Sequence, residues 1–148
     1  MAIRIAFMKR LVFLFVSCLA ARSLTAQSQR PACFRYGPDT VRITGTLNRH
    51  MYYGAPGYGE DPKGDEKEIG FYLDLSTPAC TGAGSDPINV AHTNIRRIQL
   101  VLDQRGYDAL RPFLRKKVTL RGTLFGAITG HHHTPVLLSV LPPAHVEP

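Results

Sequence analysis

VRITGTL (Val41–Leu47) and VTLRGTL (Val118–Leu124) share the pattern V-x-[I/L]-x-G-T-L without a gap. In each stretch the apolar residues and the glycine fall at alternate positions, a period that is typical of a strand with one buried face. Glycine weakens the interior of a strand unless it marks a bend, a bulge or a close approach of two backbones. Gly45 and Gly122, at matching places, therefore predict two sharply bent strands, as a small barrel requires.

Three further strands and one helix are expected outside this repeat. The strands are IGFYLDL (Ile69–Leu75), IRRIQLVLD (Ile95–Asp103) and PVLLSVL (Pro135–Leu141), which are rich in branched or aromatic residues. A short helix is expected in YDALRPFL (Tyr107–Leu114), because its apolar residues fall on one side at helical spacing. Pro112 should limit that helix to about two turns.

The order of these elements, β-β-β-α-β-β, decides the expected fold class. It is the order of the OB-fold, a five-stranded, partly open barrel with a helix between strands three and four. We therefore expect a mainly β protein, a five-stranded OB-like small barrel with one short helix. A two-sheet sandwich is less favoured, because only five strands are evident.

Two long segments between the expected strands are predicted to be loops. The segment Ser76–Asn94 consists of turn-forming residues. The loop Tyr52–Glu68 mixes glycine, proline and tyrosine with five carboxylates. These carboxylates lack the spacing of a calcium-binding EF-hand loop, so a solvated loop is expected there.

The first 26 residues have the pattern of a secretory signal peptide. Three basic residues precede an apolar run of 11 residues, LVFLFVSCLAA, and LTA then offers a cleavage site. The run is well short of the roughly 20 residues that a membrane-spanning helix needs. We therefore expect export to the periplasm or beyond, and a single domain over residues 27–148, ordered over about 33–142 and without a transmembrane segment. FVSC loosely resembles a lipobox, so a lipoprotein anchored through Cys18 is the alternative.

The charge of the chain gives no support for a nucleic-acid partner. Four of the 18 basic residues lie in residues 1–26, so the remainder has 14 against 11 acidic residues, a net charge of +3. Nucleic-acid binding requires a clustered basic surface. Single-stranded nucleic-acid binding therefore ranks low, although Phe71 and Tyr72 could stack on bases beside the basic runs Arg96–Arg97 and Arg115–Lys117.

Cys33 and Cys80 are the two cysteines that follow the expected signal peptide. An even pair in a small exported domain predicts a disulfide. Closing a loop of this length would stabilise the fold by about 4 kcal/mol on the chain-entropy model. A catalytic cysteine would need a basic neighbour, and the local sequence offers none.

GTLFGAITGHHHTPVLL (Gly122–Leu138), together with IRRIQLVL upstream, resembles a family of small exported bacterial domains known only as a domain of unknown function. The similarity is closest from Ile95 to Leu141 and looser back to Cys33. It implies an exported bacterial protein with this histidine-containing hairpin as its hallmark. The family has no established activity, so no catalytic residue is carried over.

The three adjacent histidines could supply metal ligands. On a strand, His131 and His133 would share a face and His132 would point to the other. Two histidines at this spacing can chelate one divalent ion such as zinc, copper or nickel, but zinc needs three or four ligands. His50 and His92 are further candidates, although the sequence alone cannot bring them close.

The alternative is that the histidines form the turn between the fourth and fifth strands. Gly130 can supply a positive φ, and Pro135 suits the first residue of a strand. Neutral imidazoles would then hydrogen-bond to the backbone of the loop. In an OB-fold this loop borders the ligand-binding face, so a turn and a recognition site are compatible.

These observations favour an exported bacterial binding module for a small molecule, a glycan or an envelope protein. Metal binding through His131 and His133 is the first alternative. The chain lacks the G-x-S-x-G and H-E-x-x-H patterns, so no enzymatic activity is expected. The expected ligand contacts lie in two loops and are Tyr52, Tyr53, Tyr58, His131, His132 and His133.

Overall fold

The computed structural model describes residues 33–142 and 146. The expected signal peptide, the lipid-anchor candidate Cys18 and most of the C-terminal tail lie outside the described residues. Among the described residues, no helix has both the length and the apolar character needed to cross a membrane. The elements are β1 (Cys33–Phe34), β2 (Thr40–Tyr53), β3 (Lys67–Thr81), β4 (His92–Val101), the helix α1 (Gln104–Leu110), the 3-10 turn η1 (Arg111–Phe113), β5 (Lys117–Gly126) and β6 (Val136–Val140).

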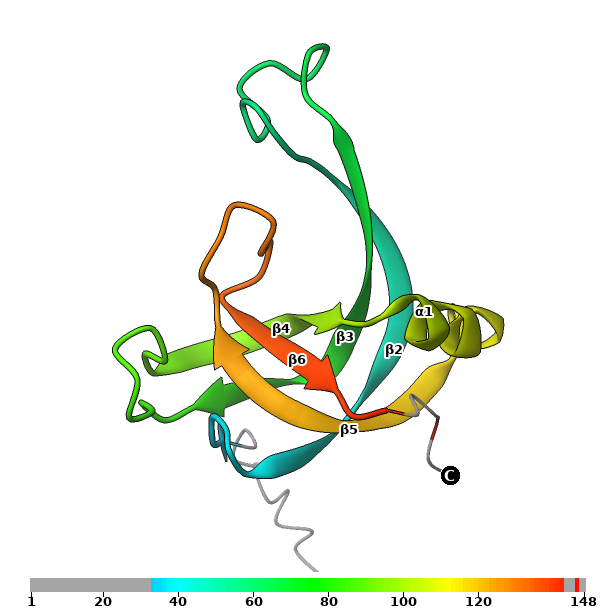
Figure 1. Cartoon of the computed structure of the whole chain (residues 1–148). Helices are drawn as coiled ribbons and strands as arrows, with labels where there is room; N and C mark the ends of the chain where they lie inside the picture. The colour runs from blue at the N-terminus through cyan, green and yellow to red at the C-terminus, as the bar shows by residue number, and fades with distance from the viewer. Residues whose placement is uncertain (1–32, 143–145, 147–148) are drawn as a thin grey trace, which may run out of the picture.

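The expectation of a mainly β protein with one short helix is confirmed. The strands form one sheet in the order β1-β3-β2-β5-β6-β4, and β3 also pairs with β4. Strands β2 to β6 therefore form a closed ring of hydrogen-bonded neighbours (Figure 1). Within that ring β4 and β6 run parallel, and the other neighbours run antiparallel.

The two repeated stretches lie in β2 and β5 and pair with each other. Ile43 is opposite Leu120 at the centre, and the glycine of each stretch is opposite the first valine of the other. A Cβ on Gly122 would collide with the backbone carbonyl of Ser139 in β6. Gly122 is thus needed for the close approach of two backbones, one of the reasons expected for a glycine inside a strand.

The structure corrects the strand count and the strand ends. Residues 33–142 contain six strands, because Cys33–Phe34 adds a short parallel strand beside β3. Ser76–Thr81 continues β3 across an irregularity in its pairing with β4, although it was expected to belong to a turn. A two-residue strand and a strand with interrupted pairing carry no clear period of two, so the pattern could not reveal them.

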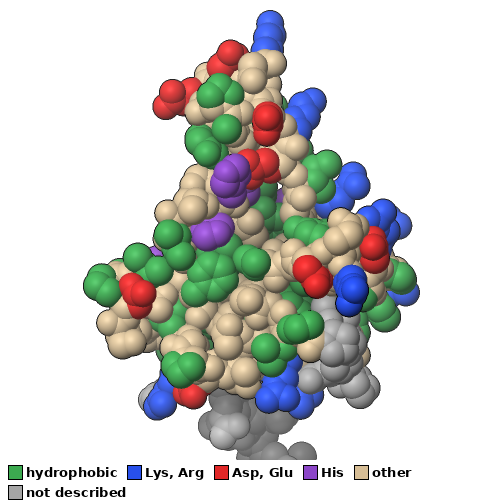
Figure 2. Space-filling model, viewed as in Figure 1, with side chains coloured by type: hydrophobic (Ala, Val, Ile, Leu, Met, Phe, Trp, Pro, Cys, Tyr) green, Lys and Arg blue, Asp and Glu red, His purple; other side chains and the backbone are tan. Residues whose placement is uncertain are grey.

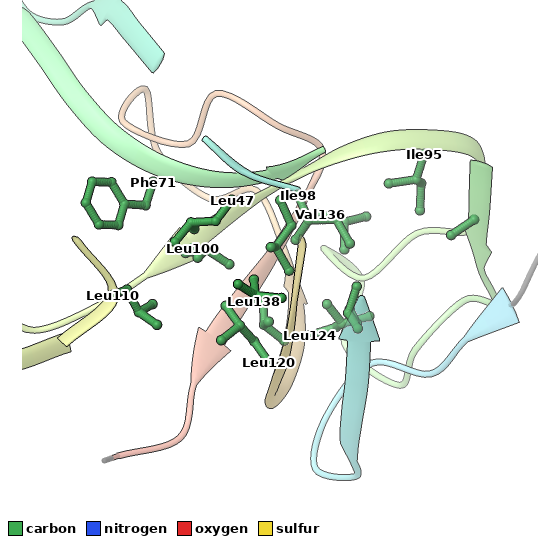
Figure 3. Close-up of a cluster of buried hydrophobic side chains, with 14 of the residues drawn as sticks. Leu47, Phe71, Ile95, Ile98, Leu100, Leu110, Leu120, Leu124, Val136 and Leu138 are labelled. Atoms are coloured by element: carbon green, nitrogen blue, oxygen red, sulfur yellow. The ribbon is translucent and has the colours of Figure 1, made fainter. Parts of the chain in front are cut away.

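The core lies inside the ring of strands, where Leu47, Leu73, Ile98, Leu120 and Leu138 have no exposed surface (Figure 3). The short helix was expected over Tyr107–Leu114 and is confirmed, although α1 begins three residues earlier. It begins there because the side chain of Asp103 accepts a hydrogen bond from the N–H of Gly106 at 2.7 Å. Leu110 places α1 on the core, since it is fully buried.

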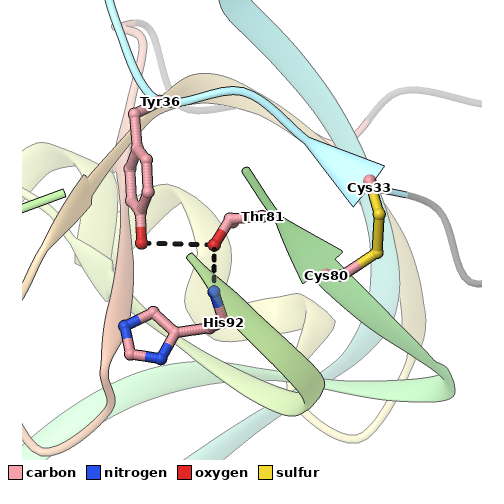
Figure 4. The surroundings of a disulfide bond; sticks show 5 residues. All are labelled: Cys33, Tyr36, Cys80, Thr81 and His92. Carbon is pink, nitrogen blue, oxygen red and sulfur yellow. Dashed lines mark hydrogen bonds between the residues drawn. A yellow bond between two sulfur atoms is a disulfide. The ribbon is translucent and has the colours of Figure 1, made fainter. Parts of the chain in front are cut away.

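The predicted disulfide is confirmed between Cys33 and Cys80 (Figure 4). The two cysteines are opposite each other in the parallel pair of β1 and β3. Beside them, Thr81 donates a hydrogen bond to the hydroxyl of Tyr36 and accepts one from the N–H of His92, at 3.3 and 3.1 Å. His92, a candidate metal ligand, therefore lies in the surroundings of the disulfide.

Candidate functional site

Two loops meet above the sheet and form the candidate site. The first, the hairpin loop, is residues 54–66 between β2 and β3, and the second, the histidine loop, is residues 127–135 between β5 and β6. Figure 1 shows the two loops rising on the same side of the molecule. The ring of Tyr58 lies directly on Gly130, where an added Cβ would be 2.5 Å from the ring. Gly130 has no positive φ, contrary to expectation, and its role is to make room for Tyr58.

Glu68, the second residue of β3, ties the histidine loop to that strand. Nδ1 of His131 donates a hydrogen bond to one carboxylate oxygen at 2.5 Å. Nε2 of His133 donates to the other oxygen at 2.9 Å. We call this arrangement the Glu68 clamp. Burial alone would raise the pKa of Glu68, but the hydrogen bonds from His133 and His131 outweigh it and lower the pKa below its ordinary value.

His133 is the better buried partner of the Glu68 clamp, with 11% of its side chain exposed against 60% for His131. Its ring stacks on Tyr52 of β2, with centroids 4.3 Å apart and the planes nearly parallel. Its backbone N–H donates to the side-chain oxygen of Gln99 at 2.7 Å. The amide nitrogen of Gln99 donates in turn to the carbonyl of His131 at 3.0 Å. Gln99 of β4 therefore fixes the histidine loop from a third element.

His132 makes its side-chain hydrogen bonds within its own loop. Its Nδ1 accepts hydrogen bonds from the N–H groups of Ile128 and Thr129, at 2.9 and 3.4 Å. Burial of the ring is the main cause that lowers the pKa of His132, and the neighbouring His131 and His133 lower it further. Because Nδ1 must be unprotonated to accept, the lowered pKa matches the geometry. His132 thus has a structural contact in the loop, whereas its predicted contact with a ligand stays a prediction.

A second carboxylate, Asp74 in β3, fixes the other side of Tyr52. Nε of Arg97 donates to Asp74 at 2.5 Å, and the amide of Asn48 donates to it at 2.7 Å. Burial would raise the pKa of Asp74, but the hydrogen bonds from Arg97 and Asn48 lower it. Arg97 also donates to the hydroxyl of Tyr52 at 3.4 Å. The ring that supports His133 is therefore itself tied to an ion pair.

A cavity of about 300 Å³ opens beside the Glu68 clamp. Tyr72 lines it and is almost fully buried, with 1% of its surface exposed. Its hydroxyl has no hydrogen-bond partner among the described residues, although buried tyrosine hydroxyls usually have one. Burial raises the pKa of Tyr72, so the hydroxyl stays a neutral donor. The lining residues are Glu68, Ile69, Gly70, Tyr72, Gln99, Tyr107, His131 and His133.

Figure 2 shows histidine side chains at the surface, below the acidic tip of the molecule and next to exposed hydrophobic side chains. The acidic tip belongs to the hairpin loop, whose carboxylates were all expected to be solvated. One of them is not. Asp65 is buried, and its side chain accepts hydrogen bonds from the N–H groups of Gly57 and Gly59 at 2.7 and 2.6 Å. A buried carboxylate therefore holds the turn of the hairpin loop.

The structure brings together four of the six residues that the sequence predicts as ligand contacts: Tyr52, Tyr58, His131 and His133. Tyr53 follows Tyr52 along the same strand, so its side chain points to the other face of the hairpin. The cavity beside them is also lined by Glu68, Tyr72 and Gln99, which the sequence did not predict as ligand contacts. Glu68 was grouped with the loop carboxylates, and the sequence holds no signal for Gln99.

Two alternatives from the sequence are not supported by the geometry. Within residues 33–142 and 146, no group of three or more His, Cys, Asp or Glu side chains is placed to hold a metal ion. His50, a candidate ligand, contacts Asp74 and Tyr72 instead. Phe71 and Tyr72, the expected stacking platforms for bases, are 4% and 1% exposed. Neither ring is therefore available to stack on a single strand.

The comparisons with known proteins give one match. The family described as "Domain of unknown function (DUF4431)" matches residues 97–141, which hold the end of β4, α1, β5, the histidine loop and β6. No curated protein and no solved structure matches the chain. The chain is thus similar over this segment to a family without an assigned activity, and its function has to be argued from the site.

Proposed function

We propose that the protein is an exported binding module that holds a small hydroxyl-rich ligand, such as a saccharide, in the cavity beside the Glu68 clamp. The buried Tyr72 hydroxyl carries this proposal. A buried donor without a partner costs free energy comparable to a lost hydrogen bond. A ligand oxygen placed in the cavity would accept from Tyr72 and remove that cost.

The other lining groups favour a ligand with many hydroxyls. The Glu68 carboxylate accepts hydrogen bonds, and the imidazole of His131, 60% exposed, has a second ring nitrogen beyond the clamp. Gln99 and Tyr107 add an amide and an aromatic ring to the same wall. A cavity with several convergent polar groups and aromatic surface is typical of a small-molecule site.

Two broader features support the same proposal. The closed strand ring with one parallel pair agrees with an OB-like arrangement, in which these two loops border the ligand face. This support is fold-level analogy and does not identify the ligand. The Cys33–Cys80 disulfide agrees with export to an oxidising compartment.

A glycan array, followed by calorimetric titration of the best-binding saccharide, tests the proposal. We expect binding by the purified, disulfide-bonded protein to weaken roughly tenfold or more in Tyr72→Phe and in the double variant His131→Ala/His133→Ala. Tyr53→Phe is the matched control, because Tyr53 lies on the other face of the same hairpin. Equal saccharide affinity in wild type, Tyr72→Phe and the histidine double variant would exclude the site.

The same protein should be titrated with zinc, copper and nickel without a histidine tag. Heat that is present in wild type and absent in His131→Ala/His133→Ala would support the metal alternative instead. In that case Glu68 would have to leave its present hydrogen bonds and join the histidines as a ligand, because zinc sites use at least three protein ligands.

A further inference from the structure

A second cavity, of about 320 Å³, lies between the β2–β3 hairpin and α1. We call it the arginine groove, because two arginines line it, Arg49 from β2 and Arg111 at the end of α1. Ile69 and Tyr107 line both this groove and the cavity beside the Glu68 clamp. The remaining lining residues are Phe71, Gln104 and Leu114.

The two guanidinium groups of the arginine groove are nearly free of protein partners. Arg49 has no hydrogen bond or ion pair with any residue that the structure describes. Arg111 makes one long contact, 3.4 Å to Asp108, and both side chains of that pair are more than half exposed. An exposed pair of this kind contributes little, so the Arg111 guanidinium can readily turn to another anion.

The floor of the arginine groove is apolar. Phe71 and Tyr107 meet edge to face there, with ring centroids 5.0 Å apart. Ile69 and its cross-strand partner Met51 remain 52% and 47% exposed. An exposed apolar surface lies here beside two cations, of which one has no side-chain partner in the described part of the chain and the other has a single weak one. This combination fits a ligand that has both an apolar part and an anionic part.

We infer that the arginine groove binds a small amphipathic anion, with its acidic group at Arg49 and Arg111 and its apolar body over Ile69 and Tyr107. Guanidinium groups bind carboxylates and phosphates through paired N–H donors. The apolar body would bury the exposed surface of Ile69. This inference goes beyond the proposed saccharide site and rests on different side chains, apart from the two residues that the cavities share.

Octanoate, octyl phosphate and 1-octanol test the inference, because they share one chain and differ in the head group. Binding to the full chain, purified with its disulfide intact, is followed by ¹H–¹⁵N NMR titration. We expect an anionic probe to shift signals of Phe71, Tyr107 and Arg111 and to bind roughly tenfold or more tightly than octanol. Tighter binding of octanoate identifies a carboxylate head group, and tighter binding of octyl phosphate identifies a phosphate.

Arg49→Gln and the double variant Arg49→Gln/Arg111→Gln should lose most of this preference for the anion. Arg105→Gln is the matched control, since Arg105 lies in α1 but does not line the groove. The inference is overturned if the double variant binds the preferred anion as wild type does. It is also overturned if octanol binds equally well, or if neither anion binds up to about 10 mM. Tyr72→Phe should leave binding of the anion unchanged, which separates this site from the saccharide site.

Discussion

At the scale of single residues, Glu68 and Tyr72 account for most of the candidate site. Glu68 accepts from both His131 and His133, so one carboxylate ties the histidine loop to the start of β3, more than 60 residues earlier in the chain. Tyr72 differs from Glu68 in its hydrogen bonding, because its buried hydroxyl has no partner among the described residues. One residue therefore stabilises the site, and the other leaves a donor available to a ligand.

Replacing Glu68 with Gln should loosen the histidine loop from β3. The variant loses both charge-assisted hydrogen bonds, and because His131 is largely exposed we expect a loss of only about 1 kcal/mol in the free energy of unfolding. Amide hydrogen exchange in the histidine loop should become faster. Glu60→Gln is the control, since Glu60 is an exposed carboxylate of the hairpin loop. Equal exchange in Glu68→Gln and wild type would contradict the account.

The lowered pKa of Glu68 also predicts a pH dependence. A carboxyl group whose pKa is lower in the folded state stabilises the fold above its ordinary pKa, near 4.3, and that contribution is lost as the pH falls through the folded value. The free energy of unfolding of wild type should therefore fall more steeply below about pH 4 than that of Glu68→Gln. Parallel pH profiles of the two proteins, from chemical denaturation, would count against the clamp.

At the scale of elements, the histidine loop depends on its own internal hydrogen bonds. His132 accepts from the N–H of Ile128, and protonation of its Nδ1 would remove that bond. The pKa of His132 is lowered in the folded state, so its contribution is complete above the ordinary value near 6.5 and is lost as the pH falls through the folded value.

We therefore expect the protection factor of the Ile128 amide, which is the ratio of its intrinsic to its observed exchange rate, to be lower at pH 5 than at pH 8. His132→Asn should reduce this pH dependence, because an asparagine side chain offers an acceptor that does not titrate. His92→Asn provides the comparison, since His92 lies near the disulfide. The prediction fails if His132→Asn retains the pH dependence of wild type.

The strand ring also depends on a close contact between β5 and β6. A Cβ on Gly122 would meet the backbone of Ser139, which cannot move aside as a flexible side chain could. Gly122→Ala should therefore cost about 2–3 kcal/mol of unfolding free energy. Gly82→Ala is a suitable control, since no atom lies within 4 Å of a Cβ built there, and its effect should stay within about 1 kcal/mol. Denaturant unfolding of both variants measures the difference.

At the scale of the whole molecule, the disulfide joins the start of the described chain to β3. Cys33 and Cys80 are separated by 47 residues, so reduction should lower the unfolding free energy by about 4 kcal/mol on the chain-entropy model. Unfolding of Cys33→Ser/Cys80→Ser, compared with oxidised wild type, measures this contribution. A difference below about 1 kcal/mol would contradict the expected contribution of the disulfide.

The sequence predicted those parts of the fold in which the buried face repeats with a fixed period. β2 and β5 were recognised because Ile43 and Leu120 alternate with polar residues in matching stretches. The disulfide followed from cysteine count, and the short helix followed from helical spacing before Pro112. Strands β2 and β3 are longer than expected. The outer half of their hairpin is exposed, so it has no buried face that a sequence pattern could reveal.

The site was predicted only in part, for a physical reason. The histidines and tyrosines stand out in the sequence, and the structure brings Tyr52 to His133. Glu68 and Gln99 acquire their roles only through contacts with residues more than 30 positions away. Such contacts depend on the register of β3 and β4, which no local pattern contains.

The unfolding free energy of Tyr72→Phe, measured with and without the best-binding saccharide, tests the central claim most directly. We predict that the variant alone is as stable as wild type or more so, because a buried hydroxyl without a partner is removed. We also predict that the saccharide stabilises the variant by about 1.4 kcal/mol less than wild type, as a tenfold weaker affinity requires. A loss of more than about 1 kcal/mol in the variant alone, or equal stabilisation of both proteins by the saccharide, would contradict the account.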